Sequence, residues 1–521
     1  RLTGMFALAL WDTQKRTLLL ARDRLGIKPL FYAQNLGALA FASELKALMT
    51  LPGFSRQVDL QSLAKFLHWQ YVPAPATIFK DCLKLLPGEK LTLGPRGVRI
   101  SRWWEPPRGA MHQEERGEED LADELDALVS RAVSERLVSD VPLGALLSGG
   151  VDSSLVAAAM QKAGQKAKTF TIGFAEQEYD EAPRARKVAD ALGTDHTELY
   201  VEPGHALEVV PRLPVIYDEP FGDPSAIPTF LVSRLARERV TVALSGDGGD
   251  ELFGGYVRYW AVDAANRALL RLPAPARRAA GVALSRLPPG LVDAVYRPLA
   301  RFLPQRFSVT GLPDKVDKLA TVLRKGGVEE LYRMSVCVWT ADQVRDLVGL
   351  SPEPGVYEES FFRSRGASAL CSMMQADLST YLPDDLLAKV DRASMASGLE
   401  VRVPLLDHRV VAFSAGVPDH FKVRGGTGKH LLKKVLARYL PPELCDGPKK
   451  GFEAPLAAWL RGELKPLMLD LLSPSALKRE GVLRPEAVGR CVDAHLSGRE
   501  DHRHRLWVLM MWEMWRREWL G

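Results

Sequence analysis

The segment Leu146-Leu147-Ser148-Gly149-Gly150-Val151-Asp152-Ser153-Ser154 lies between an apolar run at 142–147 and a helix-like stretch at 152–162. Two adjacent glycines let the backbone approach a phosphate closely, serine hydroxyls add donors, and a helix start presents free N–H groups. Asp152 could bind a magnesium ion that bridges phosphate oxygens. SGG alone fits an ordinary strand-to-helix turn, but SGGxDSS after an apolar strand favours a pyrophosphate-binding loop.

A second loop rich in glycine and acid supports this interpretation. The chain reads Val242-Ala-Leu-Ser-Gly-Asp-Gly-Gly-Asp-Glu251, again after an apolar run. Ligands of open parallel sheets bind beyond the carboxyl ends of the strands, so we expect both loops to face one crevice. The alternative is a turn whose acids are merely solvated. The chain has no GxxxxGK motif followed by Ser or Thr, which gives no support to a Walker-type phosphate loop.

The patterns around these loops divide the chain into three parts. Residues 1–105 alternate short β-prone runs with Gly or Pro turns, which predicts an antiparallel sheet; the runs are 5–11, 17–21, 30–33 and 39–42. A polar, Pro- and Gly-containing stretch at 106–120 is typical of a linker. Strand-like and helix-like runs then alternate, which predicts a doubly wound parallel sheet; the runs are 121–137, 142–147, 152–162, 169–174, 182–192, 228–237 and 240–244. From about residue 259 the pattern is almost entirely helical, and we expect no strong strand after Leu244.

Composition excludes several classes of protein. The chain has 521 residues, which indicates about three domains, with 46% hydrophobic and 26% charged residues, as in ordinary soluble proteins. Its net charge of +5 is too dilute to indicate nucleic-acid binding, and no apolar run is long enough to span a membrane. Five scattered cysteines without a CxxC pair suggest neither disulfides nor structural zinc, so we expect a cytoplasmic protein.

The motifs resemble those of a known family. SGGxDS resembles the PP-loop of ATP pyrophosphatases, and together with the segments 218–228 and 245–256 it resembles glutamine-dependent asparagine synthetase. The blocks 382–395, 398–407 and 447–452 resemble further parts of that family's synthetase domain, and the segments 4–7, 21–32 and 41–48 resemble the second half of its glutaminase domain. The resemblance covers essentially the whole chain.

The resemblance implies an α/β fold: a partial N-terminal-nucleophile hydrolase β-sandwich, then a doubly wound PP-loop domain with a largely helical C-terminal part. The implied units are 1–105, a linker at 106–120, and a synthetase domain at 121–521, with a PP-loop core to about 260 and a helical remainder at 261–521. The family's nucleophilic cysteine and the first half of its glutaminase domain are not in this sequence, which looks like a fragment. Because Cys82 has no free α-amino group, we expect it to be structural and expect no glutamine hydrolysis by the sequence as given.

Residue roles also follow from the resemblance. It assigns adenosine binding to Leu146, Ile172, Ser245 and Gly246, and pyrophosphate binding to Ser148, Gly149, Gly150, Ser153 and Ser154. It assigns magnesium to Asp152 and Asp250, formation of the acyl-adenylate to Asp247, which stands where the family often has Glu, and neutralisation of departing pyrophosphate to Lys449. Glu400 is a catalytic candidate that could pair with Arg402 near the substrate.

The implied reaction uses ATP and Mg²⁺ to convert aspartate into β-aspartyl-AMP, from which ammonia displaces AMP to give asparagine. Glutamine supplies the nitrogen in intact relatives, which are often homodimers, and free ammonia would supply it here. Two alternatives stay open: an amidotransferase for another carboxylate in a surface-polysaccharide, peptide or antibiotic pathway, and a non-catalytic regulatory protein. The C-terminal tryptophans at helical spacing predict a helix packed on the core, not a ligand site.

Overall fold

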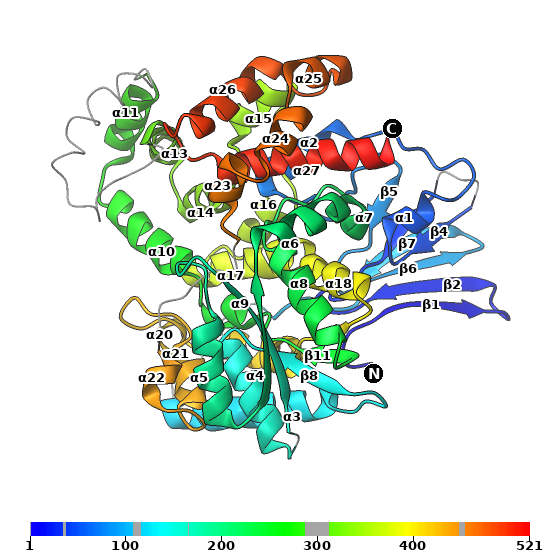
Figure 1. Ribbon diagram of the computed structural model, residues 1–521, viewed down its shortest axis with the longest axis vertical. Helices are drawn as coiled ribbons and strands as arrows, with labels where there is room; N and C mark the ends of the chain where they lie inside the picture. The colour runs from blue at the N-terminus through cyan, green and yellow to red at the C-terminus, as the bar shows by residue number, and fades with distance from the viewer. Residues whose placement is uncertain (1, 35–37, 108–115, 165, 287–311, 447–453) are drawn as a thin grey trace.

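The computed structural model describes residues 2–34, 38–107, 116–164, 166–286, 312–446 and 454–521 (Figure 1). Its chain folds into antiparallel sheets at the N-terminus, a parallel sheet in the middle and a largely helical remainder, as predicted. No helix among these residues is both long and apolar enough to cross a membrane.

The N-terminal region contains two antiparallel sheets. The first has the order β1-β2-β6-β7, with bounds Ala7–Asp12, Thr17–Arg22, Glu89–Gly94 and Gly97–Arg102. The second has the order β4-β3-β5, with bounds Ala40–Ala42, Phe31–Ala33 and Cys82–Lys84. Two helices that the sequence analysis did not predict, α1 (Leu45–Leu48) and α2 (Leu60–Trp69), lie between β4 and β5 in the chain. Helix α2 begins where the Asp59 carboxylate accepts hydrogen bonds from the Gln61 and Ser62 N–H groups.

The middle of the chain forms a five-stranded parallel sheet in the order β10-β9-β8-β11-β12. The bounds are Asp195–Val201, Lys168–Phe174, Leu143–Leu146, Val242–Leu244 and Glu400–Arg402. Helices α3 (Glu118–Arg136), α4 (Val151–Lys162), α5 (Ala182–Leu192) and α8 (Ala226–Arg237) connect and cover the strands. One apolar core contains Phe170 with α8, and a second contains Ala145 with α3 and α4, so the sheet is covered on both faces as predicted.

Two strands correct the sequence analysis. Strand β12 lies far beyond Leu244, where no strong strand was expected, and its three residues, Glu-Val-Arg, carry almost no β signal of their own. Strand β10 is an edge strand whose polar residues hide the apolar run that marks a buried parallel strand. Both form because a neighbouring strand offers hydrogen-bonding groups, which is information that a local pattern does not contain.

Helices make up most of the remaining described chain. Their bounds are α6 Pro203–Val209, α7 Leu213–Tyr217, α9 Gly249–Phe253, α10 Val257–Leu270, α11 Ala274–Ser285, α13 Leu312–Lys325, α14 Val328–Val336, α15 Ala341–Val348, α16 Val356–Arg363, α17 Ala369–Ser379, α18 Leu387–Ala396, α19 His408–Gly416, α20 Asp419–Lys422, α21 His430–Leu436, α22 Pro442–Cys445, α23 Leu456–Arg461, α24 Lys465–Leu471, α25 Pro474–Glu480, α26 Pro485–Leu496 and α27 Arg503–Trp519. A π-helical turn, Leu382–Leu386, precedes α18.

The last helix joins the two ends of the chain. Helix α27 packs beside the N-terminal region (Figure 1), and its Trp507, Trp512 and Trp515 are almost completely buried, as predicted. The Trp515 ring lies 5.6 Å from the Phe79 ring, and its indole N–H donates to the Asp218 carbonyl at 2.9 Å. The C-terminal helix therefore stabilises the N-terminal region against the rest of the protein.

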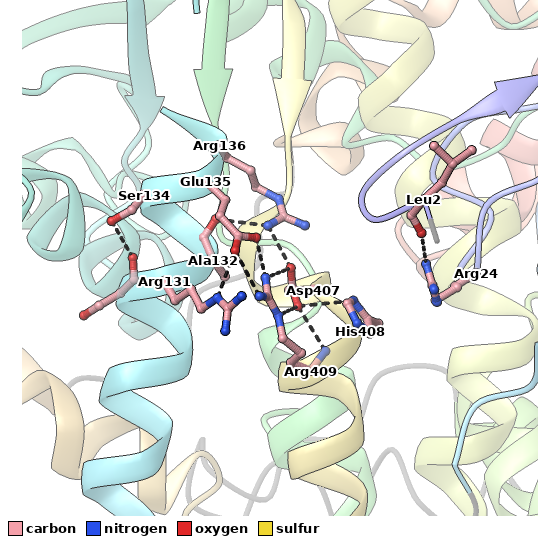
Figure 2. Close-up of polar contacts among 11 residues, drawn as sticks. Leu2, Arg24, Arg131, Ala132, Ser134, Glu135, Arg136, Asp407, His408 and Arg409 are labelled. Atoms are coloured by element: carbon pink, nitrogen blue, oxygen red, sulfur yellow. Dashed lines mark hydrogen bonds and ion pairs between the residues drawn. The ribbon is translucent and has the colours of Figure 1, made fainter. Parts of the chain in front are cut away.

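A buried carboxylate connects α3 with the segment that follows β12. Asp407 is 2% exposed, caps the start of α19, and accepts from Arg136 at 3.1 Å and from the Arg409 Nε at 2.8 Å. Figure 2 shows Glu135 completing this cluster through a hydrogen bond from Arg409. Although burial alone would raise the pKa of Asp407, the hydrogen bonds from both arginines hold it well below the usual range.

The substitution Asp407→Asn should lower the free energy of unfolding at pH 7 by about 3 kcal/mol, because it leaves a buried guanidinium without its counter-charge. The stability gained from ionised Asp407 is fully present above the unfolded-state pKa of about 3.9 and is lost as the pH falls below it. Urea titrations of both proteins should therefore show a difference at pH 7 that shrinks toward pH 3. Asp342→Asn, in an exposed ion pair, serves as the control and should change little. Equal effects of the two substitutions would contradict this account.

Candidate functional site

A cavity of about 1210 Å³ lies at the carboxyl ends of β8, β9 and β11. This is the edge at which ligands of doubly wound sheets bind. The predicted residues that line it are Leu146, Ser148, Gly149, Gly150, Asp152, Ser153, Ile172, Ser245, Gly246, Asp247 and Asp250. Both loops thus face one space, as the sequence predicted, and the space is large enough for a nucleotide together with a second small molecule.

The first loop is organised by its own hydroxyl groups. The Ser153 hydroxyl accepts from the Ser148 N–H at 3.2 Å and lies 3.0 Å from the Ser148 hydroxyl, which accepts from the Gly150 N–H at 3.3 Å. Gly149 has a φ of +73°, and a Cβ there would lie 2.8 Å from the Ala185 nitrogen. The loop therefore delivers the start of α4, with its N–H groups and positive dipole end, to the cavity wall, where an anion is favoured.

Glycines also let the second loop touch the first. A Cβ on Gly246 would lie 2.6 Å from the Ser153 nitrogen, and one on Gly249 would lie 2.4 Å from the Asp152 Cγ. Real Cβ atoms do not approach that closely, so only glycine permits this packing. The contact fixes the distance between the first loop, residues 148–153, and the acids that follow β11. The first loop is called the phosphate-type loop below.

The acids Asp152 and Asp250 meet at a lysine that the sequence analysis missed. The Lys429 ammonium contacts the Asp152 carboxylate and lies 2.8 Å from Asp250 Oδ1. Burial alone would lower the pKa of Lys429, but the two carboxylates raise it, so the ammonium is charged. Lys429 precedes α21 in a glycine-rich segment, Gly425-Gly-Thr-Gly-Lys429; a lysine in such a segment was a usable but weak signal.

A second charged cluster lies beside Asp247. The Ser245 hydroxyl donates to Asp247 at 2.7 Å. Burial raises the pKa of the Asp247 carboxyl above its usual value, although the Ser245 hydrogen bond and the nearby Lys389 act in the opposite direction. The Lys389 ammonium donates to Asp223 and to the Ser225 hydroxyl, both at 2.8 Å, and all three residues line the cavity. Sequence reasoning placed Asp223 and Lys389 within family-like blocks but gave them no role.

The N-terminal region also reaches this cavity. Gln70, which follows α2 with a φ of +68°, lines the cavity wall, and its side-chain amide donates to Asp385 at 2.8 Å. Its carbonyl accepts from the Gly222 N–H at 2.7 Å. Burial and the neighbouring Asp223 raise the pKa of Asp385 far above its usual value.

Two predicted site residues lie elsewhere. Glu400 pairs with Arg402, as expected, but it is opposite Val242 at the amino end of β12, the sheet edge away from the cavity. Ser154 is fully buried on the inner side of α4 and does not line the cavity. Both corrections have the same reason: the direction of the backbone decides which side chains at the end of a strand or the start of a helix point toward the ligand. Lys449 lies outside the described residues.

The donor set suits a hard cation better than a transition metal. Asp152 and Asp250 offer carboxylate oxygens, and the described residues contain no cluster of three His, Cys, Asp or Glu side chains able to hold a metal alone. Mg²⁺ fits such a site because it keeps waters and takes further ligands from phosphates. Cys82 is fully buried, and burial raises the pKa of its thiol to about 12, which agrees with a structural role.

The same organisation occurs in known proteins. The family model described as asparagine synthase matches residues 124–517, and that of the glutamine amidotransferase domain matches 1–104. A Mycobacterium tuberculosis protein named "Putative asparagine synthetase", glutamine-hydrolyzing, is 34% identical over 99% of this chain and 76% of its own length. Asparagine synthetase 1 of Bacillus subtilis, also glutamine-hydrolyzing, is 29% identical over 99% of this chain and 77% of its own. Amidase chyE of Penicillium rubens is 26% identical over 94% of this chain and 75% of its own length.

A glutamine amidotransferase domain followed by an asparagine synthase domain with a parallel sheet defines a class of carbon–nitrogen ligases. Within that class, the chain belongs to the asparagine synthase family, and it is an enzyme of that type.

The substitution Gly246→Ala should weaken ATP binding at least about tenfold, equivalent to about 1.4 kcal/mol, because its methyl group would push the second loop away from Ser153. Equilibrium dialysis with labelled ATP measures this directly. The control is Gly489→Ala in α26, where a Cβ meets nothing within 4 Å. Unchanged ATP affinity in Gly246→Ala, at unchanged melting temperature, would show that the contact between the loops does not shape the site.

Proposed function

We propose that this protein amidates the side-chain carboxylate of aspartate at the expense of ATP, and releases asparagine, AMP and pyrophosphate. The observation that supports this most directly is the arrangement of two charged clusters in one cavity. One cluster lies beside the phosphate-type loop and contains Asp152, Asp250 and Lys429. The other is separate from it, is not needed to bind phosphate groups, and contains Asp223, Asp247 and Lys389. One cluster suits the phosphates and the other suits the acceptor.

The nucleotide end uses backbone and hydroxyl groups. The Ser148, Gly149, Gly150 and Ser153 loop would hold the β- and γ-phosphates, and Leu146, Ile172, Ser245 and Gly246 would contact the adenosine. A magnesium ion on Asp152 and Asp250 would neutralise charge on the pyrophosphate as it leaves. Lys449 would add a second positive charge, a role that rests on the resemblance of its loop.

The acceptor end uses Asp247 and Lys389. An ammonium carries three N–H donors, and the two hydrogen bonds of Lys389 leave one for an acceptor carboxylate beside Asp247. The surrounding acids, Asp223, Asp247 and Glu251, favour an acceptor that also carries a positive charge, as the α-ammonium of aspartate does. The carboxylate oxygen attacks the α-phosphorus and pyrophosphate leaves; ammonia then attacks the acyl carbon, and AMP leaves with that oxygen while a proton is released.

The nitrogen is proposed to come from ammonia, either free or released from glutamine by an amidotransferase domain. Gln70 connects the amidotransferase region with the cavity, and a smaller cavity of about 50 Å³ lies beside it between the two regions, lined by Leu30 and Lys84 on one side and Asp384 and Asp391 on the other. The five cysteines are free, which suits a reaction in the cytoplasm. A different carboxylate acceptor is the second candidate, and it is favoured by the similarity to a protein named as an amidase.

The test is product formation from Mg-ATP, aspartate and ammonium chloride, with pyrophosphate, AMP and asparagine quantified in one sample. We expect equal amounts of all three. Asp247→Asn should lower the rate about a hundredfold, as loss of one preorganised polar group at a reacting centre does, while ATP binding is retained.

The matched control is Glu400→Gln, which changes a carboxylate at the opposite edge of the sheet and should leave the rate unchanged. Pyrophosphate release with another carboxylate, but none with aspartate, would transfer the proposal to the second candidate. No pyrophosphate release with any carboxylate would refute it.

A further inference from the structure

Lys429 occupies a position that is defined by two acids from distant parts of the chain. Asp152 stands in the first turn of α4 and Asp250 in the first turn of α9, and the Lys429 ammonium contacts both carboxylates. The three side chains are 10%, 15% and 18% exposed for Lys429, Asp152 and Asp250, so the contact is largely shielded from water. Shielding strengthens such contacts and makes an unpaired charge costly.

The backbone holds the lysine in this place. Lys429 has a φ of +59°, a left-handed conformation that is unfavourable for a residue with a side chain, and its N–H donates to the Phe253 carbonyl at 3.1 Å. Gly255 leaves the room that these side chains occupy, because a Cβ there would overlap both the Asp250 carboxylate and the Lys429 Cε in their present positions. The surrounding structure therefore determines the position of the ammonium; it is not a mobile surface lysine.

A divalent cation on Asp152 and Asp250 needs the same carboxylate oxygens as the ammonium does. We propose that Lys429 is an internal counter-ion that holds these two acids together in the place of the divalent cation, so that the cation enters this site with the nucleotide and not before it. This inference rests on the magnesium role proposed above, but not on the identity of the acceptor.

The nucleotide makes the exchange of partners favourable. A cation that arrives bound to phosphates needs only the two carboxylates and water to complete its oxygen ligands. The displaced ammonium then finds phosphate oxygens at the same cavity wall, where charge-assisted hydrogen bonds replace those it loses. A free cation offers the ammonium no such partner, so it must compete with a shielded ion pair.

The experiment measures binding of Mn²⁺, used in place of Mg²⁺, from the signal of free Mn²⁺ in electron paramagnetic resonance spectra. Wild-type protein should bind Mn²⁺ weakly alone and with one-to-one stoichiometry when ATP is present. Lys429→Met should bind Mn²⁺ without ATP at least about tenfold more tightly than wild type, because the competing charge is gone. Lys429→Arg, which keeps the charge, should resemble wild type.

Lys433→Met is the matched control, because Lys433 lines the same cavity but pairs with the exposed Asp446 at 2.6 Å. It should leave Mn²⁺ binding without ATP unchanged. Stoichiometric Mn²⁺ binding by wild type without ATP would overturn the proposal, and this result does not depend on the folding of any variant. Equal or weaker Mn²⁺ binding by Lys429→Met would also overturn it. Neither readout depends on amidation, so failure of the proposed function is distinguished from failure of this inference.

Discussion

The site depends on the close approach of two loops that are almost 100 residues apart in the sequence. Gly246 and Gly249 bring the loop after β11 against Ser153 and Asp152 of the loop after β8, at distances that no side chain would permit. Strands β8 and β11 are neighbours in the parallel sheet, so their carboxyl ends place both loops at one edge. The distance between the phosphate-type loop and the acids that follow β11 is thus a property of the sheet.

Charge is the second constraint on the cavity. Three of its acids are paired with lysines that come from later parts of the chain: Lys429 pairs with Asp152 and Asp250, and Lys389 pairs with Asp223. These pairs keep buried carboxylates compensated, which a protein interior requires. On the proposal made above, a ligand binds by exchanging ionic partners, and the specificity of the site then lies in which new partner a ligand can offer to each lysine.

The sequence predicted the parts of the structure that local patterns encode. The strand–loop–helix unit around Ser148 and the acids after β11 were found because glycine, hydroxyl and carboxylate spacing carries the chemistry directly. Lys429 and Lys389 were missed because their importance comes from contacts with residues far away in the sequence, Asp250 and Asp223. Strand β12 was missed because its pairing with β11, and not its own composition, makes it a strand.

The two errors at the site have a common cause. Glu400 and Ser154 belong to motifs that resemble the family's. Glu400, however, lies at the amino end of β12, away from the cavity, and Ser154 is buried on the inner side of α4. A motif identifies the segment that reaches a ligand, whereas backbone direction decides which side chains do. The structure also gave the N-terminal region a contact with the cavity, through Gln70, that no sequence pattern indicated.

The central claim is that the cavity directs a carboxylate oxygen of the acceptor to the α-phosphorus of ATP. The most direct measurement uses aspartate labelled with ¹⁸O in its side-chain carboxylate, with mass spectrometry of the nucleotide product. The account predicts that each AMP formed carries one ¹⁸O atom from aspartate. Unlabelled AMP, or ADP with labelled phosphate, would contradict it, because the bond to phosphorus would then have formed elsewhere.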